Sequence, residues 1–128
     1  PPDKQGWIID VGTGKDKTNT LGLKLCLKNA GISTSGDVEQ YIEINGIRYS
    51  HILNPKTGLG LTNRIQVTVL SYNASISDPL ATAACVLGLE KGSKMIESYK
   101  KTSALFIVQD GTNRTMKSTS RFPIKWLN

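Results

Sequence analysis

The sequence predicts an α+β domain in which an antiparallel sheet carries two helices on one face. The order of elements is the first observation, because strand patterns occupy both ends of the 128 residues and two consecutive helix patterns lie between them. The second observation is Asn45-Gly46, a dipeptide that favours the type I′ turn of an antiparallel hairpin. The length is typical of one domain, which we expect to span residues 1–128.

Composition limits the partners that the chain can be expected to bind. The net charge of +6 favours an anionic partner. The Lys and Arg residues are scattered, and the few aromatic residues do not interleave with them, so solubility or attraction for a phosphate-bearing cofactor is favoured over nucleic acid. No apolar run has the length of a membrane span, and the N-terminal residues lack the pattern of a signal peptide.

The two cysteines are far apart, Cys26 in an expected strand and Cys85 in an expected helix, without a Cys-x-x-Cys motif or a nearby histidine. We therefore expect two buried free thiols, in preference to a disulfide or a metal site. This leaves the redox compartment open.

The first elements are expected to be strands. Trp7–Val11 is a short apolar run, and the leucines of 21–27 alternate with other residues at the period of a half-buried strand. The polar segment 12–17 between them contains a Gly-Lys pair but is not a phosphate-binding P-loop, because Ile9 and Asp16 occupy positions where that motif needs Gly and Ser or Thr. It is interpreted as a hairpin connection.

The middle of the chain predicts a turn, a hairpin and a loop. Ser33–Asp37 is rich in small residues and reads as a turn. Asn45-Gly46 then joins two strands, Gln40–Ile44 and Ile47–Leu53, the second of which carries the only histidine, His51. The Pro and Gly of the segment 54–58 predict a chain reversal.

Strands are expected on both sides of a helical region. Ile65–Leu70 alternates as a strand, and Asp78-Pro79 predicts a helix start, with Asp78 as N-cap. The first helix is expected to end at Gly88. Its predicted apolar stripe consists of Leu80, Ala83, Ala84 and Leu87.

A second helix is expected over about 90–100. The residues that it is expected to bury are Met95, Ile96 and Tyr99. Ala104–Val108 and a stretch ending in Phe122–Leu127 are the last predicted strands, the first of them closed by the Asp110-Gly111 turn.

Three short blocks together are more specific than any of them alone. The first is Ser33-Thr34-Ser35-Gly36-Asp37, the second runs from Tyr49 to Gly58 around Ser50-His51-Ile52, and the third is Asp78-Pro79-Leu80-Ala81-Thr82-Ala83. In this order they resemble the C-terminal half of the ApbE-type FAD:protein FMN transferases, whose pattern is a Thr-Ser-Gly-Asp turn, a His-Ile-x-x-Pro-x-Thr-Gly loop and an Asp-x-x-Ala-Thr-Ala helix start. The resemblance covers about residues 7–108 and implies an ApbE-like fold related to the T-fold.

The resemblance also implies the roles of individual residues. The flavin cofactor would be bound by Thr34, Ser35, Gly36, Asp37 and His51. Asp78 and Thr82 would hold Mg²⁺, for which a carboxylate and a hydroxyl four residues apart on a helix are suitable hard oxygen ligands. From the residues alone, Asp78 capping a helix and Thr82 facing a neighbouring strand is the alternative. His51 is the expected catalytic base, although a lone histidine on a strand is more often structural.

The implied reaction cleaves FAD, releases AMP and links FMN through its phosphate to a Thr or Ser hydroxyl of an acceptor protein. Because the resemblance covers only half of a typical family member, we expect a fragment, or a half enzyme that oligomerises. Family members usually lie on the periplasmic side of the bacterial inner membrane, and the resemblance extends that expectation to this chain. The alternatives are a non-catalytic FAD-binding or protein-interaction module, and binding of anions through net charge alone.

Overall fold

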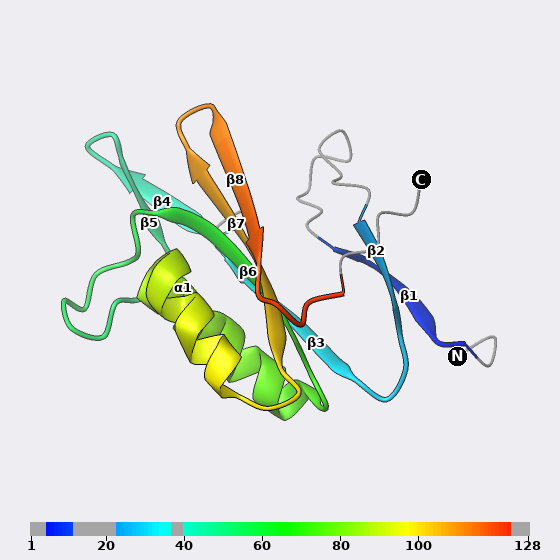
Figure 1. Cartoon of the computed structure of the whole chain (residues 1–128). Helices are drawn as coiled ribbons and strands as arrows, with labels where there is room; N and C mark the ends of the chain where they lie inside the picture. The colour runs from blue at the N-terminus through cyan, green and yellow to red at the C-terminus, as the bar shows by residue number, and fades with distance from the viewer. Residues whose placement is uncertain (1–4, 12–22, 37–39, 124–128) are drawn as a thin grey trace.

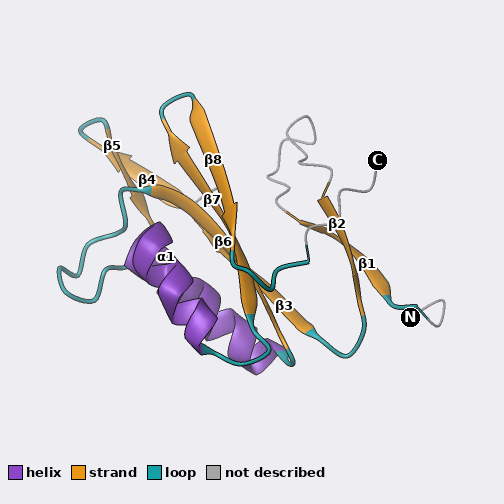
Figure 2. Ribbon diagram, viewed as in Figure 1, coloured by secondary structure: helices purple, strands orange, loops and turns teal. Residues whose placement is uncertain are grey.

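The computed structural model describes residues 5–11, 23–36 and 40–123, which form three layers (Figures 1 and 2). The middle layer is an antiparallel sheet with the strand order β3-β6-β7-β8. α1 covers one of its faces and the hairpin β1-β2 lies on the other. The elements are β1 Trp7–Val11, β2 Leu23–Leu27, β3 Gly31–Gly36, β4 Tyr41–Ile44, β5 Ile47–Ser50, β6 Arg64–Ser71, α1 Ala74–Ser98, β7 Ser103–Asp110 and β8 Asn113–Ser118.

The central strand β6 has a core on each side. Val67 and Val69 pack toward α1 with Phe106 of β7. Leu70 belongs to the second core, which contains Leu25 of β2. Because both faces of the sheet are covered, almost the whole of β6 is buried, including its polar residues on the β1-β2 side.

Several predicted strands and turns are confirmed. The β4-β5 hairpin turns at Asn45 and Gly46, whose φ angles of 51° and 76° both have the positive sign that a type I′ turn requires. β6 and β7 contain the strands expected there, and Gly111, with φ of 57°, lies in the β7-β8 turn. The predicted connection 12–17 lies outside the described residues.

The predicted start of the helix is wrong. α1 begins at Ala74 with Asn73 as N-cap, because the Asn73 side chain accepts a hydrogen bond of 3.0 Å from the Ile76 N–H. Asp78 is therefore not a cap, and Pro79 lies inside the helix. Asp78-Pro79 is a typical helix start, but Asn73, five positions before Asp78, is an equally good capping residue and is the one that the fold uses.

α1 consists of two helical segments that meet at Gly88, where the backbone angles (φ 76°, ψ −179°) are not helical. A Cβ on Gly92 would lie 2.9 Å from the Ala84 carbonyl oxygen. Eight residues of a straight helix span about 12 Å, so the chain must fold back at Gly88 and pack the second segment against the first. The two segments correspond to the two helices predicted on one face of the sheet.

The burial predictions fail at three positions. Leu87 and Tyr99 are exposed, at 41% and 46%, because the helix face that reaches the sheet instead presents Ala81, Cys85 and Ile96. Cys26 is exposed because β2 alternates, with the leucines facing the core. Cys85 is buried as expected, and the two cysteines form no disulfide.

Within the described ranges, no helix combines the length and apolarity needed to cross a bilayer.

The segment after β8 is not the strand that was predicted around Phe122. Phe122 is buried in an irregular segment, and residues beyond 123 lie outside the described part of the chain. Arg121 donates hydrogen bonds to the carbonyls of Glu97 and Tyr99 at the C-terminal end of α1, at 2.9 and 3.0 Å. The Ser120 N–H and O–H donate to the two carboxylate oxygens of Glu97, at 2.7 and 3.0 Å. These hydrogen bonds therefore hold Ser120 and Arg121 against the C-terminal end of α1.

The contacts of Glu97 predict an acid-sensitive contribution to stability. Hydrogen bonds from the Ser120 backbone and side chain, aided by the positive charge of Arg121, lower the pKa of Glu97 below its ordinary value of 4.5. A lowered folded-state pKa adds stability above the ordinary value, and that stability is lost as the pH falls through the folded-state pKa. Urea midpoints should therefore show Glu97→Gln less stable than wild type at pH 7, with the difference shrinking in acid.

A matched control is Glu90→Gln, on the same helical segment, for which we expect little change at either pH. If the Glu97→Gln deficit is equally large at neutral and acid pH, the carboxylate interactions are not its cause.

Candidate functional site

The first block of the sequence motif forms an edge strand of the sheet and not the turn that was predicted. Ser33, Thr34 and Ser35 lie in β3, which pairs with β6 in antiparallel register. Side chains alternate between the two faces of a strand. Ser33 and Ser35 face α1, whereas Thr34 faces the β1-β2 side, where its hydroxyl is 2.8 Å from that of Thr68.

Two hydroxyl pairs connect this strand to α1. The Ser33 and Ser77 hydroxyl oxygens are 2.8 Å apart, and those of Ser35 and Thr82 are 3.0 Å apart. The buried Cys85 thiol also donates to the Ser35 carbonyl oxygen, at 3.3 Å. The first and third blocks of the motif are therefore in direct contact, although Ser35 and Thr82 are 47 positions apart in the sequence.

The close approach of strand and helix depends on Gly31. A Cβ at this position would lie 2.2 Å from the Asn73 carbonyl carbon and 2.3 Å from the Ala74 nitrogen. Both neighbours are backbone atoms at the start of α1, so they cannot move aside as a side chain would. Glycine at residue 31 lets the first turn of α1 lie directly against β3.

Asp78 and Thr82 lie one helical turn apart on the exposed side of α1. Among the described residues, no group of three or more His, Cys, Asp or Glu side chains is arranged to hold a metal. One carboxylate and one hydroxyl nevertheless match Mg²⁺, which keeps several waters and is usually bound by one or two carboxylates together with substrate phosphates. The donor chemistry fits a magnesium site that a phosphorylated ligand completes.

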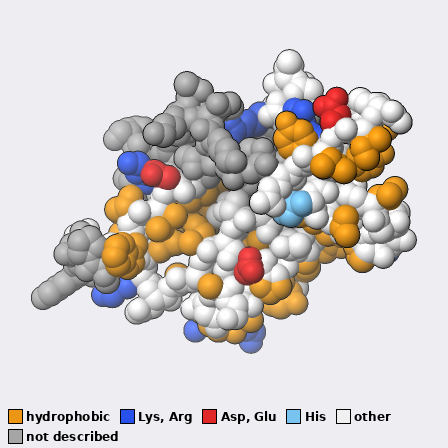
Figure 3. Space-filling model, turned by 180° about the vertical axis from the view of Figure 1, so that it is seen from behind, with side chains coloured by type: hydrophobic (Ala, Val, Ile, Leu, Met, Phe, Trp, Pro, Cys, Tyr) orange, Lys and Arg blue, Asp and Glu red, His pale blue; other side chains and the backbone are white. Residues whose placement is uncertain are grey.

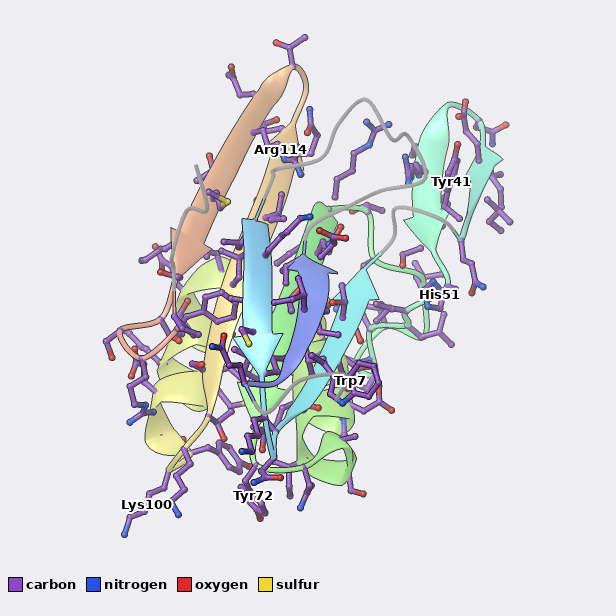
Figure 4. All side chains as sticks on the ribbon, turned by 90° about the vertical axis from the view of Figure 1, so that its right-hand side faces the viewer. Trp7, Tyr41, His51, Tyr72, Lys100 and Arg114 are labelled. Carbon is purple, nitrogen blue, oxygen red and sulfur yellow. The ribbon has the colours of Figure 1, made fainter. Side chains whose placement is uncertain are left out.

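His51 follows the end of β5 and is exposed; Figures 3 and 4 show it at the surface, at the base of the β4-β5 hairpin. Its Nδ1 and its backbone nitrogen are both 3.1 Å from the Gln40 carbonyl oxygen. Because a carbonyl oxygen only accepts hydrogen bonds, Nδ1 carries the proton in the neutral ring. This leaves Nε2 available to accept a proton.

The loop after His51 is fixed by its own hydrogen bonds. Ser50 N–H donates to the Leu61 carbonyl at 2.8 Å, and Leu61 N–H to the Ile52 carbonyl at 2.9 Å. Ile52 and Leu61 are also buried in the core beneath α1. His51 is therefore held on both sides, by the hairpin and by a loop anchored in the core.

The loop contains a tight turn that begins at Asn54. The Asn54 side-chain oxygen accepts the Lys56 N–H at 2.9 Å, and Gly58 closes the turn with φ of 69°. A side-chain oxygen at this position therefore supports the turn in the manner of an Asx-turn.

The structure thus brings Ser35 to Thr82 and places Asp78 beside them, while Thr34 points to the opposite side of the sheet. Gly36 ends β3, and Asp37 lies outside the described residues. Sequence reasoning missed Ser33, Ser77, Cys85 and Gln40 as supporting residues. The alternation of residues 33–35 was the available signal for the serines, since reading it as a strand would have put Ser33 and Ser35 on one face.

Comparison with known proteins identifies the family. The model of the ApbE family matches residues 1–106, so the chain belongs to the ApbE family. Among curated relatives, an FAD:protein FMN transferase of Vibrio cholerae is 38% identical over 93 residues, which cover 72% of this chain and 28% of the relative. One of Klebsiella pneumoniae is 31% identical over 106 residues, 82% of this chain and 30% of the relative.

Solved structures of ApbE proteins resemble this chain in fold. The apo flavinyl transferase ApbE of Pseudomonas stutzeri superposes with a TM-score of 0.72 at 34% identity, over 90% of this chain and 35% of that one. The ApbE protein of Thermotoga maritima gives a TM-score of 0.75 at 27% identity, over 91% and 37%. The chain therefore has the fold of one part of these proteins and spans less than a third of the length of the two curated relatives.

The Thr34 side chain faces away from α1. We therefore expect removal of its hydroxyl to lower the stability of the fold and to leave metal binding at Thr82 unchanged. In Thr34→Val the 1%-exposed Thr68 loses the hydroxyl partner that the structure gives it, which should cost about 1–3 kcal/mol of unfolding free energy. Urea unfolding measures this loss, and Mn²⁺ affinity, with Mn²⁺ as a paramagnetic substitute for Mg²⁺, should be unchanged. Weaker Mn²⁺ binding at full stability would contradict the separation of the two faces.

Proposed function

We propose that this chain supplies the metal-binding and proton-accepting part of an FAD:protein FMN transferase. The observation that carries the proposal is the Ser35–Thr82 contact, which joins the two blocks that bear the implied cofactor-binding and metal-binding residues. Membership of the ApbE family and the names of the curated relatives support the same activity. The reaction proposed is the transfer of FMN from FAD to a Thr or Ser hydroxyl of an acceptor protein, with release of AMP.

Asp78 and Thr82 would hold Mg²⁺ beside the pyrophosphate of FAD. When bound, the cation would neutralise charge on the phosphates, the main requirement in transfer of a phosphate group. The Ser35 hydroxyl of β3 lies beside this position, 3.0 Å from that of Thr82. The positive net charge of the chain favours the approach of an anionic substrate.

His51 is proposed as the general base. The Gln40 carbonyl holds the proton on Nδ1, so Nε2 can take the proton of the acceptor hydroxyl as its oxygen attacks phosphorus. The exposure of His51 suits a reaction with a protein substrate, whose hydroxyl must reach the site from solvent.

A second function, binding of FAD without turnover, is favoured by one observation. The chain covers only 28% and 30% of the two curated relatives described above, so the matched region is less than a third of each protein that carries the transferase name. The two functions differ in AMP release and not in flavin binding.

The test is an FAD titration of the chain with and without Mg²⁺, followed by chromatography for AMP in the presence of a Thr-containing acceptor peptide. We expect binding that requires Mg²⁺, and release of AMP. Asp78→Ala should lose both, because it removes the only carboxylate of the proposed site. His51→Gln should keep FAD binding and lower the rate of AMP release by about 10²–10⁴-fold.

Lys117→Ala on β8, at the opposite edge of the sheet from β3, is the matched control and should behave as wild type. Mg²⁺-dependent binding without AMP release would support the second function. Full activity of Asp78→Ala would contradict the metal assignment.

A further inference from the structure

We propose that Ser35 is a positioning residue for the metal site: it accepts the hydroxyl proton of Thr82 and so directs the lone pairs of Thr82 toward the cation. The inference rests on the proposed function and assigns Ser35 a role distinct from direct contact with flavin. It starts from one measured contact, the 3.0 Å separation of the Ser35 and Thr82 hydroxyl oxygens.

The polarity of this hydrogen bond follows from the chemistry of a hydroxyl ligand. A hydroxyl has one proton and two lone pairs, and a metal is bound through a lone pair. The proton must therefore point away from the cation, toward an acceptor. Ser35 Oγ is the hydrogen-bond partner that the structure gives to the Thr82 hydroxyl within the described residues.

The helix offers Thr82 a competing arrangement. A threonine in a helix divides between two χ1 rotamers, because its hydroxyl can also bond the carbonyl three or four residues earlier, which here includes that of Asp78. The contact with Ser35 instead selects the rotamer in which the hydroxyl points toward β3. Without it, Thr82 would spend part of its time bonded to its own helix, with the ligand oxygen misplaced.

Ser35 is itself held from two directions. Its backbone is in register with Val67 of β6, and the buried Cys85 thiol donates to its carbonyl oxygen at 3.3 Å. Cys85 lies three residues after Thr82, on a neighbouring part of the same helix surface. One residue of β3 is thus tied to both helix positions, and the strand fixes where the ligand oxygen lies.

The structure contains a matched control for this role. Ser33 pairs with Ser77 in the same way, from the same face of β3 to the same helical segment, at 2.8 Å. Ser77 is completely buried and is not a proposed ligand, so this pair can contribute to packing alone. A difference between the two pairs in metal affinity therefore isolates positioning from stability.

The experiment measures Mn²⁺ affinity of the chain, with FAD present to supply the phosphates that complete the site, from the electron paramagnetic resonance signal of free Mn²⁺. Loss of an outer-shell partner typically weakens metal binding by 10–100-fold, so we expect about a tenfold weaker affinity in Ser35→Ala. Ser35→Thr keeps an acceptor hydroxyl on an exposed-edge strand, where a β-branched residue is well tolerated, and should restore the affinity. Ser33→Ala should bind Mn²⁺ as wild type does. Urea unfolding of both alanine variants records their stability.

Each outcome decides a separate point. Wild-type affinity in Ser35→Ala, together with lost binding in Asp78→Ala, overturns the positioning role and leaves the proposed metal site standing. Equal weakening in Ser33→Ala and Ser35→Ala, or failure of Ser35→Thr to restore binding, also overturns it, because either result indicates a packing effect. No Mn²⁺ binding by the wild type, or unchanged binding in Asp78→Ala, removes the metal site and the inference with it.

Discussion

The contact between the first turn of α1 and β3, made possible by Gly31, is the constraint on which the site depends. No side chain fits between residue 31 and the backbone of Asn73 and Ala74. Because the helix starts directly against the strand, its next turns stay within hydrogen-bonding distance of the serines of β3. A larger residue at position 31 would move the helix outward and separate Ser35 from Thr82. A backbone packing requirement thus determines where the proposed ligands lie.

Sequence predicted well those features that local chemistry controls. Asn45-Gly46 identified its hairpin because the turn needs two residues with positive φ, and Gly88 marked a real end of a helical segment for a similar reason. The helix start was misplaced because Asn is as good a capping residue as Asp, and local sequence does not tell which of two suitable residues, Asn73 or Asp78, the fold uses. The error matters for the site, since Asp78 inside the helix is free of the capping role that competed with metal binding.

The arrangement of the site depends on distant contacts and could be predicted only in part. Residues 33–36 look like a turn, but pairing with β6 makes them a strand and places Thr34 and Ser35 on opposite faces. The family resemblance implied a cofactor-binding role for both residues and did not distinguish between them. Similarly, no local pattern indicates that the Gln40 carbonyl sets the tautomer of His51, because that contact depends on how the hairpin closes.

The central claim is that β3 and α1 form one cation site on one face of the sheet. The most direct test is a two-dimensional ¹H–¹⁵N NMR spectrum of the chain titrated with Mn²⁺ in the presence of FAD, since paramagnetic broadening falls steeply with distance from the ion. The account predicts that the amide signals of Ser35, Asp78 and Thr82 broaden first, while those of β8 at the far edge of the sheet remain sharp. Broadening that starts elsewhere, with these three signals unaffected, would contradict it.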